Sequence, residues 1–95
     1  MANYRLSPNA QDDLERIWLY GLEHWGVAEA DRYIEALFER FSELAEQPLL
    51  YPAVDEIRDG YRRNVCGSDS IYYHIASDAV EIMAILGQQD TGEWL

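Results

Sequence analysis

The sequence predicts an α+β domain with the element order β-α-α-β-β-β, in which an N-terminal helical hairpin packs on an antiparallel sheet. Two long stretches in the first half carry apolar residues at helical spacing, and three later stretches alternate apolar and polar residues at strand spacing. The 95 residues are 48% hydrophobic and 13% aromatic, which suffices for one compact core. We therefore expect a single domain spanning residues 1–95.

A short strand and a helix are expected first. Residues 3–6 alternate apolar and polar side chains, as a brief strand does. Ser7 followed by Pro8 is typical of a helix start, because serine caps the first turn and proline already has helical φ. Asp12 and Asp13 follow within reach of the positive helix end. The apolar stripe of this helix comprises Ala10, Leu14, Ile17, Gly21 and Trp25, widened by Trp18 and Leu22.

A second helix is expected over about Val27–Glu46, directly after Gly26, which ends the first helix. Its apolar face comprises Ala30, Ile34, Leu37, Phe38, Phe41, Leu44 and Ala45. Because the connection at Gly26 is so short, the two helices should form an antiparallel hairpin. Pro48 ends the second helix, and residues 48–60 are expected to form a loop.

Three strands are expected in the second half of the chain. They span about Tyr61–Cys66, Ser70–Ile75 and Ala79–Leu86. Gly67-Ser68 and Ser77-Asp78 stand between them as turn residues, which favours an antiparallel meander.

The charge balance excludes one class of function. The chain has eighteen acidic residues and seven basic residues, all of them arginine, which gives a net charge of −11. Such a surface repels phosphate backbones, so binding of nucleic acid through a broad basic surface is disfavoured.

A cytoplasmic location is expected. The N-terminal residues contain no apolar stretch that suits a signal peptide, and no apolar run has the length of a membrane span. The one cysteine, Cys66, cannot form an intramolecular disulfide, which fits a reducing compartment.

Five fragments together resemble a known family. They cover residues 4–86 in order, and they read YRLSPNAQDDLERIWLY…HWG, ADRYI…L…LAEQP, DEIRDGYRR, GSDSIYYHI and VEIMAIL. Each fragment alone is unspecific, whereas five in register over a short chain are much more specific. On these residues the chain resembles the ParE branch of the ParE/RelE superfamily of type II toxin–antitoxin systems.

This resemblance implies a partner and a target. A ParD-like antitoxin, encoded beside the toxin, would neutralise it in a hetero-oligomer, and DNA would be contacted only indirectly through the antitoxin. ParE-type members poison DNA gyrase. The alternative implied by the superfamily is a RelE-type nuclease, which cleaves messenger RNA on the ribosome.

The chain departs from the family after its last predicted strand. Many relatives continue from Ile-Leu with His-x-Arg-x-Asp, whereas here Leu86 is followed by Gly87-Gln88-Gln89-Asp90. A non-toxic protein that still binds an antitoxin therefore remains a third hypothesis.

The candidate catalytic groups are few. A ribonuclease needs a general base, a general acid and a cation for the phosphorane charge. We interpret His24 as a helix-capping residue and His74 as a surface or edge-of-core residue. With no lysine and no C-terminal histidine, we predict no catalytic residue and a protein that acts by binding. We also predict no cofactor and no metal, because no ligand spacing supports either.

Arg58, Arg62 and Arg63 form the densest positive cluster. Arg62 and Arg63 should point to opposite faces of a strand. We predict that these three arginines form charge-assisted contacts with an acidic partner, either an antitoxin tail or the target, which Trp94 of the polar tail would also contact. The alternative is that the arginines pair with the nearby acids Asp55, Glu56 and Asp59 or with acids of the helices.

The aromatic residues of the helices divide into two sets. Trp25, Phe38 and Phe41 are expected in the core. The first helix is apolar over more than one face, which suggests a surface for an amphipathic antitoxin segment. The candidate antitoxin-binding residues are Leu14, Trp18, Leu19, Tyr20, Leu22 and Tyr33.

Overall fold

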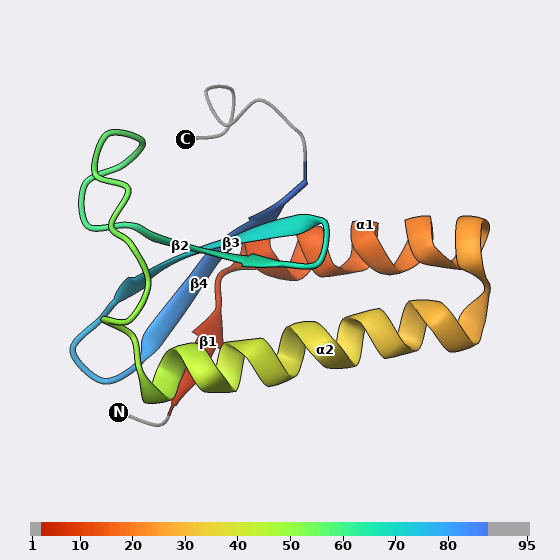
Figure 1. Cartoon of the computed structure of the whole chain (residues 1–95), viewed down its shortest axis with the longest axis horizontal. Coiled ribbons are helices and arrows are strands. Elements are labelled where there is room, and N and C mark those ends of the chain that lie inside the picture. Colours follow the sequence, from red (N-terminus) through yellow and green to blue (C-terminus); the bar gives the residue numbers. More distant parts are fainter. Residues whose placement is uncertain (1–2, 88–95) are drawn as a thin grey trace.

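The structure, a computed structural model, describes residues 3–87 and confirms the predicted order of elements. These are β1 (Tyr4–Leu6), α1 (Pro8–Trp25), α2 (Val27–Glu46), β2 (Arg62–Cys66), β3 (Asp69–Ile75) and β4 (Val80–Leu86). The two helices run antiparallel, and their connection extends along the long axis of the molecule past the end of the sheet (Figure 1). No helix within residues 3–87 combines the length and apolar character needed to cross a membrane.

The sheet has the strand order β1-β4-β3-β2. Strands β2, β3 and β4 form the predicted antiparallel meander. Strand β1, in contrast, pairs with β4 in parallel, Tyr4 lying opposite Val80 and Leu6 opposite Ile82. The sheet is therefore mixed. Local periodicity could not reveal this direction, because the hairpin, the loop and two strands separate β1 from β4.

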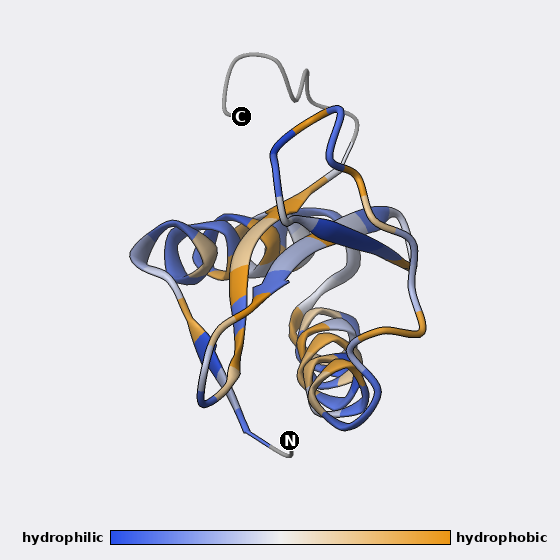
Figure 2. Cartoon of the chain, turned by 90° about the vertical axis from the view of Figure 1, so that its left-hand side faces the viewer, coloured by the Kyte–Doolittle hydropathy of each residue, from blue (hydrophilic) through white to orange (hydrophobic). Residues whose placement is uncertain are grey.

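Two apolar clusters lie on opposite faces of the sheet. The larger one joins the helices to the sheet and includes Leu14, Ile17, Leu37, Phe41, Leu44, Ile71, Tyr73, Val80, Ile82 and Ile85. The smaller one is closed by the loop after α2, whose Val54, Ile57 and Tyr61 pack on Tyr72, Ala84 and Leu86. Figure 2 shows the helices end-on as separate coils, with hydrophobic residues concentrated along the central strands.

The predicted helix boundaries are confirmed by their caps. The Ser7 hydroxyl accepts a hydrogen bond from the backbone N–H of Ala10 at 3.0 Å, and Pro8 occupies the start of α1. Gly26 has φ +89° and ends α1 while also preceding the first residue of α2. This positive φ is accessible to glycine at little cost, so one residue suffices to reverse the chain.

The helices approach each other closely at Gly21. A Cβ atom on Gly21 would lie 3.0 Å from the Cβ atom of Ala30. Beyond this contact the hairpin leaves the sheet, which exposes Trp25 (Figure 1). Phe38, which lies further along α2 and was also expected in the core, is exposed as well. Trp25 is 46% exposed and Phe38 is 39% exposed, whereas Phe41 is fully buried as predicted.

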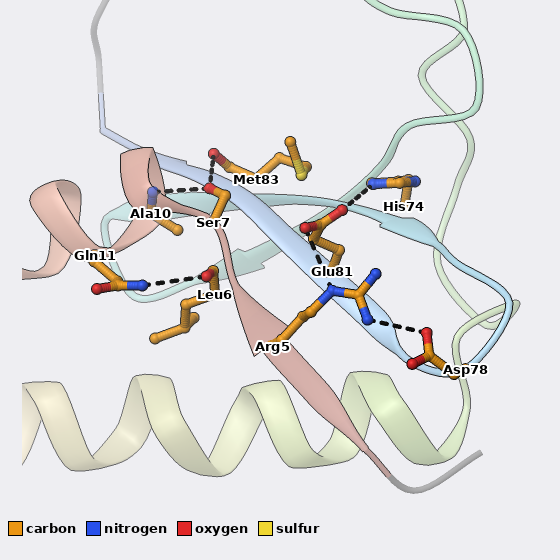
Figure 3. A network of polar contacts seen from close by, with 9 residues as sticks. All are labelled: Arg5, Leu6, Ser7, Ala10, Gln11, His74, Asp78, Glu81 and Met83. Atoms are coloured by element: carbon orange, nitrogen blue, oxygen red, sulfur yellow. Dashed lines mark hydrogen bonds and ion pairs between the residues drawn. The ribbon is translucent and has the colours of Figure 1, made fainter.

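The edge of β4 is covered by side chains of α1 where β1 ends. A bulge at Met83 turns the strand here, since Tyr72 pairs with Ala84 and Tyr73 pairs with Ile82. The Ser7 hydroxyl donates to the carbonyl oxygen of Met83 at 3.1 Å. The network around Ser7 is drawn in Figure 3.

Further along the same edge, Asp13 and Arg16 bond to Ile85. The Asp13 carboxylate accepts from the Ile85 N–H at 2.9 Å, and the Arg16 guanidinium donates to the Ile85 carbonyl at 2.8 Å. The expected role of Asp12 and Asp13 at the helix end is not found, because neither lies in the first turn. The side chains of Ser7, Asp13 and Arg16 thus take the place of a further strand at this edge.

A charged network fixes β1 and β3 to β4 on the face opposite the helices. The Arg5 guanidinium donates to Asp78 at 2.9 Å and to Glu81 at 3.4 Å, and Glu81 also pairs with His74 at 2.8 Å (Figure 3). The hydrogen bond from His74, followed by Arg5, lowers the pKa of Glu81 below its usual value. Arg5 likewise lowers the pKa of Asp78.

Replacing Ser7 with alanine should lower the free energy of unfolding by about 1–2 kcal/mol, because it removes both the helix cap and a donor to Met83. Urea denaturation followed by circular dichroism measures this change. Ser42→Ala serves as the control, since the exposed Ser42 hydroxyl makes only a 3.5 Å contact within its own helix. A loss for Ser7→Ala no larger than the control would contradict this role.

The Arg5 network should make stability depend on acid pH. Folded pKa values below the unfolded values mean that the ionised Asp78 and Glu81 stabilise the fold above about pH 4. This contribution is lost as pH falls through the lowered folded pKa values. Arg5→Gln should therefore be less stable than the parent at neutral pH, and the difference should shrink in acid.

Urea denaturation at a series of pH values measures this convergence. Arg32→Gln is the matched control, because the Arg32–Glu29 pair lies within one helix and touches neither β1 nor β4. A stability difference for Arg5→Gln that stays constant from neutral to acid pH would rule out the network as its cause.

Candidate functional site

The hairpin and the β2–β3 turn enclose two adjoining hollows of about 520 and 550 Å³. Both hollows are lined by Trp25, Tyr33 and Ser68. We call them together the hairpin groove. The remaining lining residues are Arg16, Ile17, Tyr20, Asp69 and Gly87 in the first hollow, and Glu29, Arg32 and Ala36 in the second.

Three aromatic rings form the apolar part of the hairpin groove. The Trp25 ring meets Tyr20 and Tyr33 edge-on, with centroid distances of 5.8 Å in both cases. Tyr20 is 53% exposed, although it belongs to a helix that packs on the sheet. Exposed aromatic rings held by one another are typical of surfaces that bind other polypeptides.

Tyr33 connects α2 to the β2–β3 turn. Its hydroxyl donates to the Asp69 carboxylate at 2.6 Å and lies 3.1 Å from the Cys66 carbonyl oxygen. Burial, followed by this bond to Asp69, raises the pKa of Tyr33 to about 12, so the hydroxyl remains a donor. Gly67 has φ +61°, and a Cβ atom there would lie 2.7 Å from the Tyr33 ring.

The structure divides the candidate antitoxin-binding residues of the sequence analysis. Tyr20 and Tyr33 line the hairpin groove. Trp18 lies on the outside of the hairpin, where its indole donates to Asp31 at 3.0 Å and joins the helices, and Leu19 is about half exposed. The two other candidates are less accessible: Leu22 is half-buried, and Leu14 packs in the core.

Sequence reasoning missed Trp25, Arg16 and Ser68 as groove residues. Trp25 shares the apolar stripe of α1, so it was assigned to the core. A usable signal was its place directly before Gly26, because no further helical turn follows to cover it.

The structure places the three arginines of the predicted cluster in different surroundings. Arg62 donates to the Tyr51 carbonyl at 2.6 Å and is half-buried, so it holds the loop. Arg63 is exposed and donates to the Ser70 hydroxyl at 3.1 Å, while Arg58 lies 5.7 Å from the centre of the Tyr61 ring. In residues 3–87 none of the three forms an ion pair with a carboxylate. Trp94 lies outside the described residues.

We call Arg58 and Arg63 the loop-side arginines. Arg63 lies opposite Tyr72 in the sheet, and both Tyr61 and Tyr72 belong to the cluster that the loop covers. The loop-side arginines therefore lie on the face of the sheet opposite the helices, away from the hairpin groove.

Both histidines are engaged in structural contacts. The Nδ1 atom of His24 lies 2.8 Å from the Tyr20 carbonyl oxygen in the last turn of α1, which agrees with the predicted cap. His74 pairs with Glu81 and stacks on Tyr61. Neither histidine lines the hairpin groove. Within residues 3–87 no group of three or more potential metal ligands is close enough to hold an ion.

The Tyr33–Gly67 contact should be detectable by mutation. In Gly67→Ala the added Cβ atom would clash with the Tyr33 ring, and the backbone would also be strained at φ +61°. Gly60→Ala is a matched control, because Gly60 has φ +81° but has no atom within 4 Å of the added Cβ. We expect Gly60→Ala to cost about 1–2 kcal/mol from backbone strain. Gly67→Ala should cost clearly more in thermal unfolding, and equal losses would refute the contact.

Comparison with known proteins gives matches over almost the whole chain. Residues 4–92 match the family described as ParE toxin of type II toxin-antitoxin system, parDE. The Toxin ParE1 of Mycobacterium tuberculosis (strain ATCC 25618 / H37Rv) is 35% identical over 89 residues, covering 93% of this chain and 91% of the relative. The Toxin ParE1 of Caulobacter vibrioides is 38% identical over 88 residues, with the same coverage.

A solved structure shows the same fold. The chain aligns to a structure titled chromosomal ParDE TA system from P. aeruginosa with a TM-score of 0.81 and 15% identity, covering 94% of this chain and 98% of the other. The sequence family and this shared fold agree with the resemblance seen in the five fragments. The chain belongs to the ParE toxin family of type II toxin–antitoxin systems.

Proposed function

We propose that this protein is the toxin of a toxin–antitoxin pair, that a ParD-like antitoxin neutralises it by binding the hairpin groove, and that the free toxin acts in the cytoplasm by binding DNA gyrase. The observation that carries this proposal is the hairpin groove, in which the exposed rings of Tyr20 and Trp25 and the half-buried ring of Tyr33 lie together on α1 and α2. The relatives named Toxin ParE1 and the structural neighbour titled a ParDE system support the partner.

The antitoxin-binding surface extends over the outside of the hairpin. Tyr20, Trp25 and Tyr33 supply pockets for apolar side chains, and the half-exposed Leu19 continues the apolar surface along α1. A segment that fills this groove would bury aromatic rings, which dominate the energetics of most interfaces. The toxin and antitoxin would form a hetero-oligomer that contacts DNA through the antitoxin.

The loop-side arginines are the proposed contacts to gyrase. Arg58 and Arg63 are exposed and make no ion pair with a carboxylate within residues 3–87, so both can form charge-assisted hydrogen bonds with an acidic surface. They lie on the other face of the sheet from the hairpin groove. Arg62 is left out of this surface, because its guanidinium already holds the Tyr51 carbonyl.

A binding mechanism, rather than catalysis, fits the polar groups. The His74–Glu81 pair is the one histidine–carboxylate ion pair in residues 3–87, but the guanidinium of Arg5 also binds Glu81. A carboxylate bound by a permanent cation stays ionised and is a weak proton acceptor. The net charge of −11 further disfavours an RNA substrate.

Purified protein mixed with gyrase and plasmid should inhibit supercoiling or trap cleavage complexes, and the antitoxin encoded in the neighbouring reading frame should relieve the effect. Arg58→Ala combined with Arg63→Ala should weaken inhibition, because both arginines are proposed contacts. Arg32→Ala is the control, since Arg32 lies on the hairpin and pairs with Glu29.

Absence of any effect on gyrase at large excess would defeat the target assignment. Codon-positioned cuts in messenger RNA in a translating extract would establish the RelE-type alternative instead. Normal growth on expression of the chain alone, with antitoxin binding retained, would identify a non-toxic binding partner.

A further inference from the structure

Charge is unevenly divided between the two parts of the molecule. The hairpin, residues 8–46, carries ten acids and three arginines, a net charge of −7. The other described residues, 3–7 and 47–87, carry six acids and four arginines, a net charge of −2. The part of the chain that contains most of the hairpin groove is therefore the strongly negative part.

The three arginines of the hairpin are already bonded within the chain. Arg16 donates to the Ile85 carbonyl at 2.8 Å, and Arg32 pairs with Glu29 at 2.6 Å. Arg40 donates to the Asn64 side chain at 2.7 Å and to the Val65 carbonyl at 2.9 Å. Arg16 and Arg32 line the hairpin groove, but each already pairs with a carboxylate of this chain, so the lining contains no unpaired cation among residues 3–87.

Six of the ten hairpin acids form no side-chain hydrogen bond or ion pair among residues 3–87. They are Asp12, Glu15, Glu23, Glu35, Glu39 and Glu46, and all are exposed. Two of these acids flank the hairpin groove at helical spacing. Glu23 lies three residues after Tyr20 on α1, and Glu39 lies three residues after Ala36 on α2, so each shares a helix face with a groove residue.

We propose that the segment bound in the hairpin groove is cationic, with an apolar anchor for the aromatic rings and lysine or arginine residues on both sides of it. This inference rests on the proposed function, since it gives the chemistry of the antitoxin segment that the groove takes. An apolar anchor fits the space between Tyr20, Trp25 and Tyr33. Flanking cations meet Glu23 and Glu39, where the negative potential favours association.

The same charges exclude two other occupants. An acidic antitoxin segment would place like charges beside acids that have no internal partner, which costs affinity. A second copy of this chain carries −11 itself and would be repelled in the same way.

The test measures the affinity of the chain for the purified antitoxin from the neighbouring reading frame, by calorimetry, at about 0.05 M and about 0.5 M salt. The double variant Glu23→Gln/Glu39→Gln removes two charges beside the groove. The matched control Glu56→Gln/Asp59→Asn removes two charges from the loop. A third variant, Trp25→Ala, removes the central ring.

The groove variant should raise Kd about three- to tenfold at low salt and have little effect at high salt. The loop control should change Kd by less than about twofold. Trp25→Ala should raise Kd at least tenfold at both salt concentrations, roughly what the loss of a central aromatic anchor costs.

The outcomes separate this inference from the proposed function. If Trp25→Ala weakens binding but the groove variant leaves Kd unchanged or lowers it, the occupant is not cationic while the groove remains the binding site. If Trp25→Ala has no effect, or the antitoxin does not bind, both the proposed binding site and the inference fail.

Discussion

The hydrogen bonds from α1 to the edge of β4 are the constraint on which the rest of this structure depends. Strand β1 pairs only with the first half of β4, and beyond Ile82 the open edge is filled by side chains of α1. Asp13 accepts the Ile85 N–H although burial raises the pKa of its carboxyl, an effect that this N–H and Arg16 partly offset. The direction of α1 is thereby fixed by hydrogen bonds as well as by packing, and the rest of the hairpin follows from it.

A second attachment holds the free end of the hairpin. Tyr33 reaches from α2 to Asp69 and packs on Gly67, so α2 is joined directly to the β2–β3 turn. The hairpin groove lies between these two attachments. Its rings are therefore carried by helices and a pinned turn, and a binding surface on such elements needs little ordering when a partner binds.

Local signals in the sequence were enough to predict most of the scaffold. Ser7 with Pro8, the single Gly26 and the three alternating stretches determine caps, a hairpin and a meander through chemistry that acts over a few residues. The parallel pairing of β1 joins residues more than 70 positions apart, such as Tyr4 and Val80, and local periodicity does not reveal such contacts. The bulge at Met83 is a register shift between β3 and β4 that regular alternation does not reveal either.

The candidate site was predicted less completely, for a related reason. The apolar stripe of α1 continues to Trp25, but the sheet beneath it ends earlier, so the last residue of the stripe is exposed. A stripe shows which residues share a face and says nothing of where the opposing surface stops. The arginines were identified as a cluster, yet the strand directs Arg62 to the loop backbone and leaves Arg58 and Arg63 exposed on the other face.

Gly26 is the whole connection between the helices: its N–H donates to the Gly21 carbonyl, and its own carbonyl accepts from Ala30. A connection of one residue whose N–H and carbonyl are both hydrogen-bonded leaves no free loop residue between the helices. Trp25 packs edge-on against Tyr33, and the Tyr33 hydroxyl donates to Asp69. One continuous line of contacts therefore joins the end of α1 to α2 and to the β2–β3 turn.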